Sequence, residues 1–93
     1  MTKLTQAQIE TALAGLPDWK HAGHTIRRTY IFEDFNGALK FVNAVGKLAE
    51  KAGHHPDIDI RWNKVTLSLT THNEGGLTAN DPKLAAECDR VKK

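Results

Sequence analysis

The chain has 93 residues, of which 40% are hydrophobic and 26% are charged, a composition typical of one globular domain and not of a disordered segment. Its formal net charge of +2 is small and its basic residues are scattered, which argues against nucleic acid as a direct partner. Cys88 is the only cysteine, so an internal disulfide is excluded and a reducing cytoplasm fits. We find neither a leader-like apolar segment nor a membrane-spanning stretch, and expect a cytoplasmic protein without membrane contact.

The first half of the chain is predicted to form a helix, two strands and a second, longer helix. Residues 5–14 have the capping-box spacing and apolar periodicity of a helix. Residues 19–20 predict a short edge strand, and residues 25–32, which are rich in β-branched and aromatic side chains, predict another strand. The strongest helical pattern runs from Asp34 as N-cap to Gly53 as the C-terminal stop.

Residues 58–69 are predicted to form a β-hairpin. Apolar side chains alternate with polar ones along both halves of the segment: Ile58, Ile60 and Trp62, then Val65, Leu67 and Leu69. A two-residue turn at Asn63-Lys64 would bring all six onto one face of the sheet. The same register pairs His55 with His72, so it predicts that histidines from the two ends of the segment converge.

A final helix is predicted to begin near Thr78 or Asp81. These two residues have capping-box spacing, with Asp in place of Glu; alternatively, Asp81 is itself the cap and Pro82 takes the first helical position. The buried stripe of this helix is expected to be Leu84, Ala85, Cys88 and Val91. The element order predicts one α+β domain over residues 1–93, with an antiparallel sheet and the helices packed on one face.

The cluster of His54, His55 and His72 allows three interpretations. The histidines could be surface or structural residues, as single histidines usually are. They could hold zinc or another metal, although adjacent histidines on an extended backbone point apart and the chain has no HExxH motif. They could perform general acid–base catalysis, because an unperturbed imidazole gives and takes protons near neutral pH. Glu50 and Asp81 nearby favour this third interpretation, without a metal.

The histidine segment resembles the signature of a known enzyme family. Glu50-Lys51-Ala52-Gly53-His54-His55-Pro56 is similar to the signature of the pterin-4a-carbinolamine dehydratases. The resemblance continues through Trp62-Asn63-Lys64-Val65, Thr71-His72, and Gly76-Leu77-Thr78 followed by Asp81, and more loosely through residues 16–19 and 32–35.

This resemblance implies an enzyme that dehydrates 4a-hydroxytetrahydrobiopterin-type carbinolamines to quinonoid dihydropterins in tetrahydrobiopterin recycling, without a metal or other cofactor. The implied fold is a four-stranded antiparallel sheet with three helices on one face, assembled as a homodimer or homotetramer. The implied catalytic residues are His54, His55, His72 and Asp81, and the implied substrate-binding residues are Glu50, Trp19, Thr71 and Asn73. Our hypothesis is that His55 and His72 transfer most of the protons while His54 binds the pterin ring.

A second class of function stays open. Some relatives of this family act as dimerisation cofactors of a transcription factor or as assembly scaffolds without enzymatic work. The three histidines together favour the enzyme, since a pure binding module has little use for them. Individual residues also allow simpler roles: Asp81 as a helix cap, Glu50 as a solvated helix residue, and Trp19 and Trp62 as core or interface aromatics.

Overall fold

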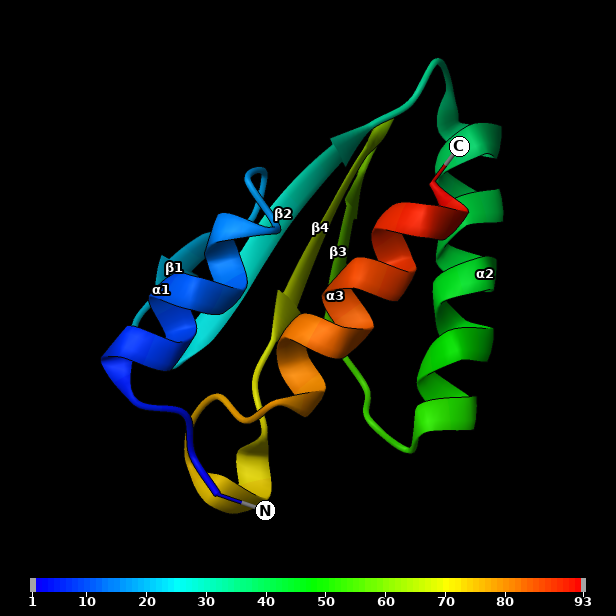
Figure 1. Ribbon diagram of the computed structural model, residues 1–93. Helices are drawn as coiled ribbons and strands as arrows, with labels where there is room; N and C mark the ends of the chain where they lie inside the picture. The colour runs from blue at the N-terminus through cyan, green and yellow to red at the C-terminus, as the bar shows by residue number, and fades with distance from the viewer. Residues whose placement is uncertain (1, 93) are drawn as a thin grey trace.

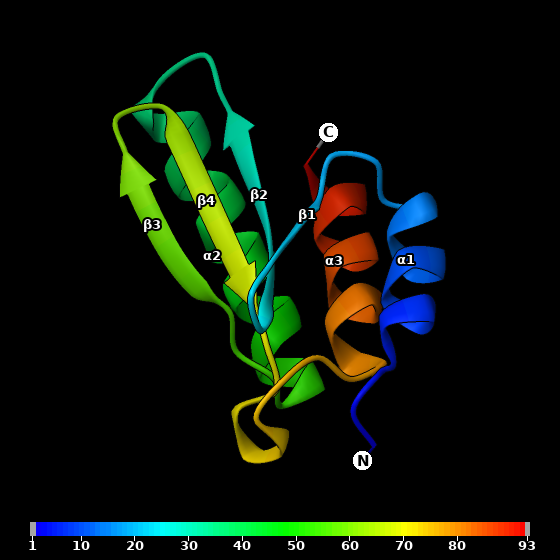
Figure 2. The same cartoon turned by 90° about the vertical axis from the view of Figure 1, so that its left-hand side faces the viewer.

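The computed structural model describes residues 2–92 as a sheet covered on one face by helices (Figure 1). Its elements in chain order are α1 (Gln6–Ala14), β1 (Lys20–Ala22), β2 (Thr25–Ile31), α2 (Phe35–Ala52), β3 (Asp57–Arg61), β4 (Lys64–Leu69), the 3-10 turn η1 (His72–Glu74) and α3 (Asn80–Val91). The four strands pair antiparallel in the order β1-β2-β4-β3, and the three helices lie on the same side of them (Figure 2). The predicted α+β fold is confirmed.

Local capping interactions set the ends of the first two helices. The Thr5 hydroxyl accepts from the Gln8 backbone N–H at 3.2 Å, and the Gln8 side chain accepts from the Thr5 N–H at 2.8 Å. Asp34 caps α2 by accepting from the Gly37 N–H at 2.8 Å, and Gly53 ends it in the left-handed conformation with φ 63°. Each cap satisfies backbone groups that a helix end leaves without partners, so the predicted boundaries are confirmed.

The hydrophobic core lies between the covered face of the sheet and the helices. Side chains from every layer are buried there, among them Ile26 and Tyr30 on β2, Val65, Leu67 and Leu69 on β4, Phe41 and Val45 on α2, and Leu84, Ala85 and Cys88 on α3. Val91, at the end of the predicted α3 stripe, is exposed instead. Within residues 2–92, no helix combines the length and apolar character needed to cross a bilayer.

The turn of the hairpin lies one residue earlier than predicted. Arg61 pairs with Lys64, so the turn consists of Trp62-Asn63. Asn63 is tied to the end of β2, because its backbone oxygen accepts from the Phe32 N–H and its Nδ2 donates to the Phe32 oxygen, both at 2.8 Å. This contact, which joins residues 31 positions apart, fixes the turn.

The new turn shifts the register of the hairpin by two residues. Ile58 therefore faces Leu67 rather than Leu69. A shift of two keeps the same side chains on the core face, except that Trp62 leaves the strand with φ 55° and is 64% exposed. The predicted pairing of His55 with His72 is wrong, because both residues lie outside the β3–β4 ladder.

Candidate active site

The C-terminus of α2 positions His54 and His55. Gly53 donates its N–H to the Glu50 oxygen at 3.3 Å, and His54 donates its N–H to the Ala49 oxygen at 3.1 Å. Together with the left-handed Gly53, these bonds form a Schellman motif, which turns the chain sharply away from the helix axis. The two adjacent imidazoles then reach different partners: His54 contacts α3, and His55 folds back onto α2.

His54 contacts a carboxylate that is completely removed from solvent. Its Nε2 lies 2.6 Å from Oδ1 of Asp81; the imidazole is 11% exposed and the Asp81 side chain is fully buried. Oδ2 of Asp81 accepts two further hydrogen bonds, from the Thr71 hydroxyl and the Thr78 backbone N–H, both at 2.9 Å. Burial of an ionised carboxylate is costly unless donors surround it, and these three donors meet that need.

The hydroxyl groups around Asp81 permit one consistent set of proton positions. The Thr71 hydroxyl gives its proton to Asp81, so in the 2.8 Å contact between the Thr71 and Thr78 hydroxyls Thr78 must be the donor. The Thr78 oxygen in turn accepts from the Asn80 N–H at 3.3 Å. With Asp81 accepting throughout, His54 donates from Nε2 and keeps Nδ1 for another partner.

The same residues start α3. Ala79 already has helical dihedral angles and makes no side-chain cap, while Thr78 accepts from the second residue after it and donates its own N–H to Asp81. The predicted capping box with Asp in place of Glu therefore forms only in part, because the Thr78 hydroxyl accepts from the Asn80 N–H and not from the Asp81 N–H. The alternative, with Asp81 as the N-cap itself, is wrong. Asp81 thus both caps α3 and contacts His54.

His55 forms a second, solvent-exposed pair with a carboxylate. Its Nε2 donates to Oε2 of Glu50 at 2.5 Å, and the two side chains are 61% and 78% exposed. An exposed pair of this kind adds little to stability. It does fix the orientation of the imidazole, with Nε2 on the carboxylate, and among the described residues Nδ1 has no hydrogen-bond partner.

His72 and Asn73 lie in η1, directly after Thr71. A backbone bridge closes this loop: Thr71 N–H donates to the Gly76 oxygen at 3.0 Å, and Gly76 N–H donates to the Thr71 oxygen at 3.4 Å. The side chains of His72 and Asn73 are exposed, and within residues 2–92 neither makes a hydrogen bond. Thr71 links the loop to Asp81 through its hydroxyl. The predicted contacts of Thr71 and Asn73 with substrate stay predictions.

A cavity of about 240 Å³ lies beside His54, between α2 and α3. Its walls are formed by Leu48, Lys51, Ala52, His54, Asn80, Lys83, Leu84 and Glu87. Of the residues predicted for the site, only His54 lines it. The sequence did not single out its polar α3 wall; the spacing of Asn80, Lys83 and Glu87 on one helical face is the signal that could have indicated it.

Trp19 lies elsewhere in the molecule. It is 2% exposed, and its Nε1 donates to both oxygens of Asp89, at 3.1 and 3.2 Å. Asp89 also accepts from Arg28 at 2.8 Å and from the Tyr30 hydroxyl. Burial, and next the bond to Asp89, raise the pKa of Tyr30. Asp89 follows Asp81 by about 12 Å along α3, so the structure does not bring Trp19 to the histidines, and its contact with substrate stays a prediction.

The candidate site combines imidazoles with carboxylates. Within residues 2–92, no group of three or more His, Cys, Asp and Glu side chains could hold a metal ion. His54 and His55 are instead each matched with one carboxylate. Imidazoles oriented by carboxylates, each with one ring nitrogen unengaged, can bind a polar substrate or exchange a proton with it.

Comparison with known proteins assigns the family. The sequence profile described as pterin 4 alpha carbinolamine dehydratase matches residues 2–91. The chain belongs to this family. A relative from Roseiflexus sp. (strain RS-1) is 53% identical over 90 residues, which cover 97% of each chain. Another from Nocardia farcinica (strain IFM 10152) is 51% identical over 95% of this chain and 93% of its own. The names of both relatives assign pterin-4-alpha-carbinolamine dehydratase provisionally.

Solved structures agree with this assignment to the dehydratase family. The crystal structure of a transcriptional coactivator/pterin dehydratase from Brucella melitensis has a TM-score of 0.95 at 32% identity, covering 99% of this chain and 100% of that chain. A pterin dehydratase-like RuBisCO assembly factor of the alpha-carboxysome has a TM-score of 0.65 at 20% identity, covering 80% and 86%. The second likeness concerns the fold alone.

Proposed function

We propose that this pterin dehydratase family member converts 4a-hydroxytetrahydropterins to quinonoid dihydropterins and water by histidine acid–base catalysis. Family membership over residues 2–91 supports the reaction class. The observation that carries the proposal is the His54–Asp81 contact, which can position the pterin ring: a buried carboxylate with three donors, one of them an imidazole that opens on a cavity. Tetrahydrobiopterin recycling in the cytoplasm is the process we propose for it.

The reaction needs one proton delivered and one removed. The hydroxyl on C4a leaves as water once it is protonated, and the adjacent ring nitrogen loses a proton as the new C=N bond forms. An imidazolium supplies the first proton and a neutral imidazole accepts the second, so the two protonation states are exchanged and solvent restores them. Each positioned acid or base of this kind typically accelerates a reaction by about 100- to 10,000-fold.

The surroundings of each histidine support a division of roles. His54 has its Nε2 on Asp81 and is nearly buried, so it suits binding of the pterin ring through Nδ1. His55 is oriented by Glu50 and faces solvent, and His72 is exposed on η1. Solvent access lets both regain or lose protons between turnovers, so we assign the proton transfers to them.

The test is a dehydration assay on substrate made in place by an aromatic amino acid hydroxylase, followed through the absorbance of the quinonoid product. We expect His55→Ala and His72→Ala to lower kcat, and His54→Ala chiefly to raise KM. His24→Ala is the matched control, because His24 is an exposed histidine on the β1–β2 turn, outside the candidate site. Unchanged rates in both the His55 and His72 variants would contradict the assigned roles.

A binding or scaffold function is the second candidate. The Brucella melitensis structure, at 32% identity, is described as a coactivator as well as a dehydratase. Exposed apolar side chains on this chain, among them Phe35, Leu39 and Trp62, support assembly, and we propose a homodimer or homotetramer. Light scattering after size-exclusion chromatography measures the oligomeric state. A folded protein with no dehydration above the uncatalysed rate would favour the scaffold.

A further inference from the structure

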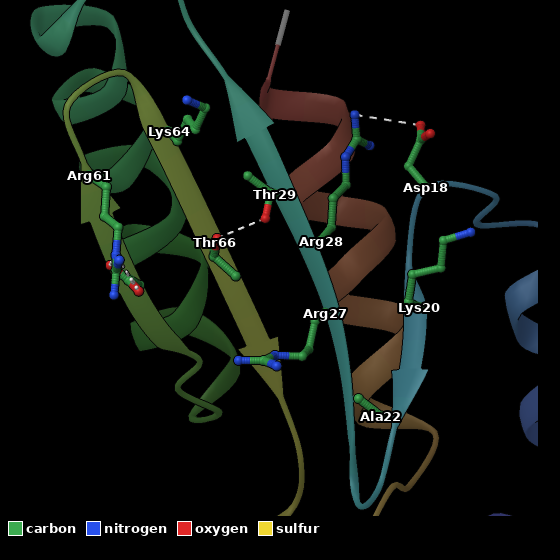
Figure 3. A pocket seen from close by; sticks show the side chains of 10 residues that line it. Asp18, Lys20, Ala22, Arg27, Arg28, Thr29, Arg61, Lys64 and Thr66 are labelled. Atoms are coloured by element: carbon green, nitrogen blue, oxygen red, sulfur yellow. Dashed lines mark hydrogen bonds and ion pairs between the residues drawn. The ribbon is translucent and has the colours of Figure 1, made fainter.

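The face of the sheet that the helices leave uncovered carries an open groove of about 610 Å³ (Figure 3). It lies across all four strands, and none of the residues predicted for the active site lines it. Arg27 and Thr29 on β2 project away from the core, because residues of one strand alternate between the two faces of a sheet. Arg28, between them, points to the helix-covered face, where it donates to Asp89 on α3. The groove is therefore separate from the cavity beside His54.

Positive charge is concentrated in this groove. It is lined by five cationic side chains and only two carboxylates. One of the cations, Arg28, is already paired with Asp89 on the helix-covered face at 2.8 Å, and the other four leave an excess of two charges. The whole chain has a formal net charge of +2, so the rest of the molecule, Arg28 included, is net zero. Both carboxylates are already paired: Asp18 lies 3.6 Å from Arg28, and Asp59 lies 3.3 Å from Arg61.

Three cations in the groove, Lys20, Arg27 and Lys64, have no ion-pair partner among residues 2–92. Arg27 is held by a neutral group, since its Nε donates to the Ser68 hydroxyl at 3.0 Å. Asp57 of β3 pairs with the same Ser68 from the other side of β4, and it forms no ion pair with Arg27. The positive charge of these three side chains is therefore not neutralised by acidic residues near the groove.

The strand register places like charges directly opposite one another. Lys20 of β1 pairs with Arg27 of β2, and Arg61 of β3 pairs with Lys64 of β4. Directly opposed like charges destabilise a sheet. Both pairs lie in the groove on the same face of the sheet. An anionic ligand bound between and above them would reduce the repulsion within each pair.

The two cationic pairs are separated by a neutral floor. The Thr29 and Thr66 hydroxyls are hydrogen-bonded across β2 and β4 at 2.8 Å, and Arg27 extends over β4 on one side of them while Lys64 lies on the other (Figure 3). Arg27 is level with Ser68, four residues along β4 from Lys64, which corresponds to about 13 Å. A ligand that engages both ends needs anionic groups about that far apart.

We propose that this groove binds an acidic segment of a partner polypeptide. In an extended chain, residues four positions apart are separated by about 13 Å, which matches the distance between the two cationic ends. The exposed apolar side chains of Ile31 and Trp62 adjoin the Lys64 end, where a polypeptide can supply an apolar contact. The carboxylates of Asp18 and Asp59 within the groove oppose the continuous charge of a nucleic acid backbone.

The probe is a fluorescein-labelled ten-residue peptide of alternating Glu and Ser, measured by fluorescence anisotropy. Binding is expected to weaken steeply as salt is raised from about 0.01 M, where the Debye length is about 30 Å, to about 0.15 M, where it is about 8 Å. The matched Gln-Ser peptide is expected not to bind. Bound acidic peptide should also protect exposed Trp62 from acrylamide quenching, whereas buried Trp19 is protected already.

Two charge-reversal variants locate the site. Lys20→Glu combined with Lys64→Glu should weaken peptide binding at least tenfold; both substitutions place a carboxylate opposite an arginine, so the fold should persist. Lys40→Glu with Lys47→Glu changes the net charge equally on exposed positions of α2 and should change binding less than twofold. Equal weakening by both variants, absence of salt-sensitive binding, or tighter binding of ten-residue oligothymidylate than of the peptide would each overturn the proposal.

Discussion

His54 of the α2 C-terminus and Asp81 of the α3 N-terminus meet at 2.6 Å, although they are 27 residues apart in the chain. The contact joins two helix ends whose local geometry is independently fixed, by the Schellman motif at Gly53 and by the hydrogen bonds of Thr78 with Asn80 and Asp81. Because local hydrogen bonds fix each end, the imidazole is held in one orientation. Such preorganisation is what a positioned catalytic or binding group requires.

Replacement of Thr71 separates a positioning role from a substrate contact. Thr71→Val removes one donor to Asp81 and leaves the Thr78 hydroxyl without its acceptor. We expect the free energy of unfolding to fall by about 1–3 kcal/mol and KM to rise with little change in kcat, because His54 then binds the pterin ring less well. Thr71→Ser keeps the hydroxyl and should restore both quantities. A raised KM with unchanged kcat and stability would instead indicate direct contact with substrate.

Glu50→Gln tests the orientation of His55. The pair is solvent-exposed, so the free energy of unfolding should change by no more than about 1 kcal/mol. The kcat for dehydration should nevertheless fall, because the amide no longer holds the imidazole as a carboxylate does. Glu33→Gln, at another exposed position, is the control. If urea unfolding and steady-state kinetics leave both variants equal to wild type, the pair has no catalytic role.

Trp62→Gly is expected to stabilise the protein. Trp62 occupies a turn position with φ 55° and is mostly exposed, so its side chain contributes little burial while its backbone conformation favours glycine. We expect the free energy of unfolding to rise by about 1 kcal/mol. Trp62→Ala retains the Cβ and should show no gain. Urea denaturation of the two variants measures the difference, and a loss of stability on introducing glycine would contradict it.

We predict that ionisation of the Cys88 thiol lowers the stability of the protein at alkaline pH. Burial, followed by the charge of Asp89, raises its pKa from 9.0 to about 12. Above pH 9.0 the unfolded chain therefore loses the thiol proton while the folded chain keeps it. Stability from this group is fully present below pH 9.0 and declines as pH rises toward 12, by up to about 1.4 kcal/mol per unit.

Cys88→Ala provides the comparison for this pH dependence. It removes the titrating group and leaves Tyr30, whose pKa is also raised, as a contribution common to both proteins. The free energy of unfolding, measured in urea between pH 8 and 10.5, should fall less steeply for the variant than for wild type. Parallel curves would mean that the thiol ionises alike in the folded and unfolded chains.

The sequence predicted those parts of the fold that short-range interactions determine. The ends of α1 and α2 depend on Thr5, Asp34 and Gly53, whose partners lie within four residues. The hairpin register depends on more. Alternation with a period of two does not distinguish registers that differ by two residues, since both keep the same face buried. The contact of Asn63 with Phe32, which decides between them, is long-range.

The candidate site was predicted in a similar, partial way. The spacing of Thr78 and Asp81 indicated a capping box, and the resemblance to the family indicated the histidines, but nothing local indicated that the capping carboxylate also contacts His54. Trp19 shows the limit of transferring a role by motif. Its indole donates to Asp89, 70 residues away, and only the packing of α3 against the sheet brings the two together.

The most direct test of the account is the kcat/KM for pterin carbinolamine dehydration in Asp81→Asn compared with Asp89→Asn. Both substitutions remove a carboxylate from α3, but only Asp81 contacts His54. With the folded fraction of each variant verified by circular dichroism, we predict that Asp81→Asn lowers kcat/KM at least about tenfold, through a raised KM, because His54 loses a hydrogen bond to a charged group, and that Asp89→Asn stays within about threefold of wild type. Wild-type kcat/KM in folded Asp81→Asn would contradict the account.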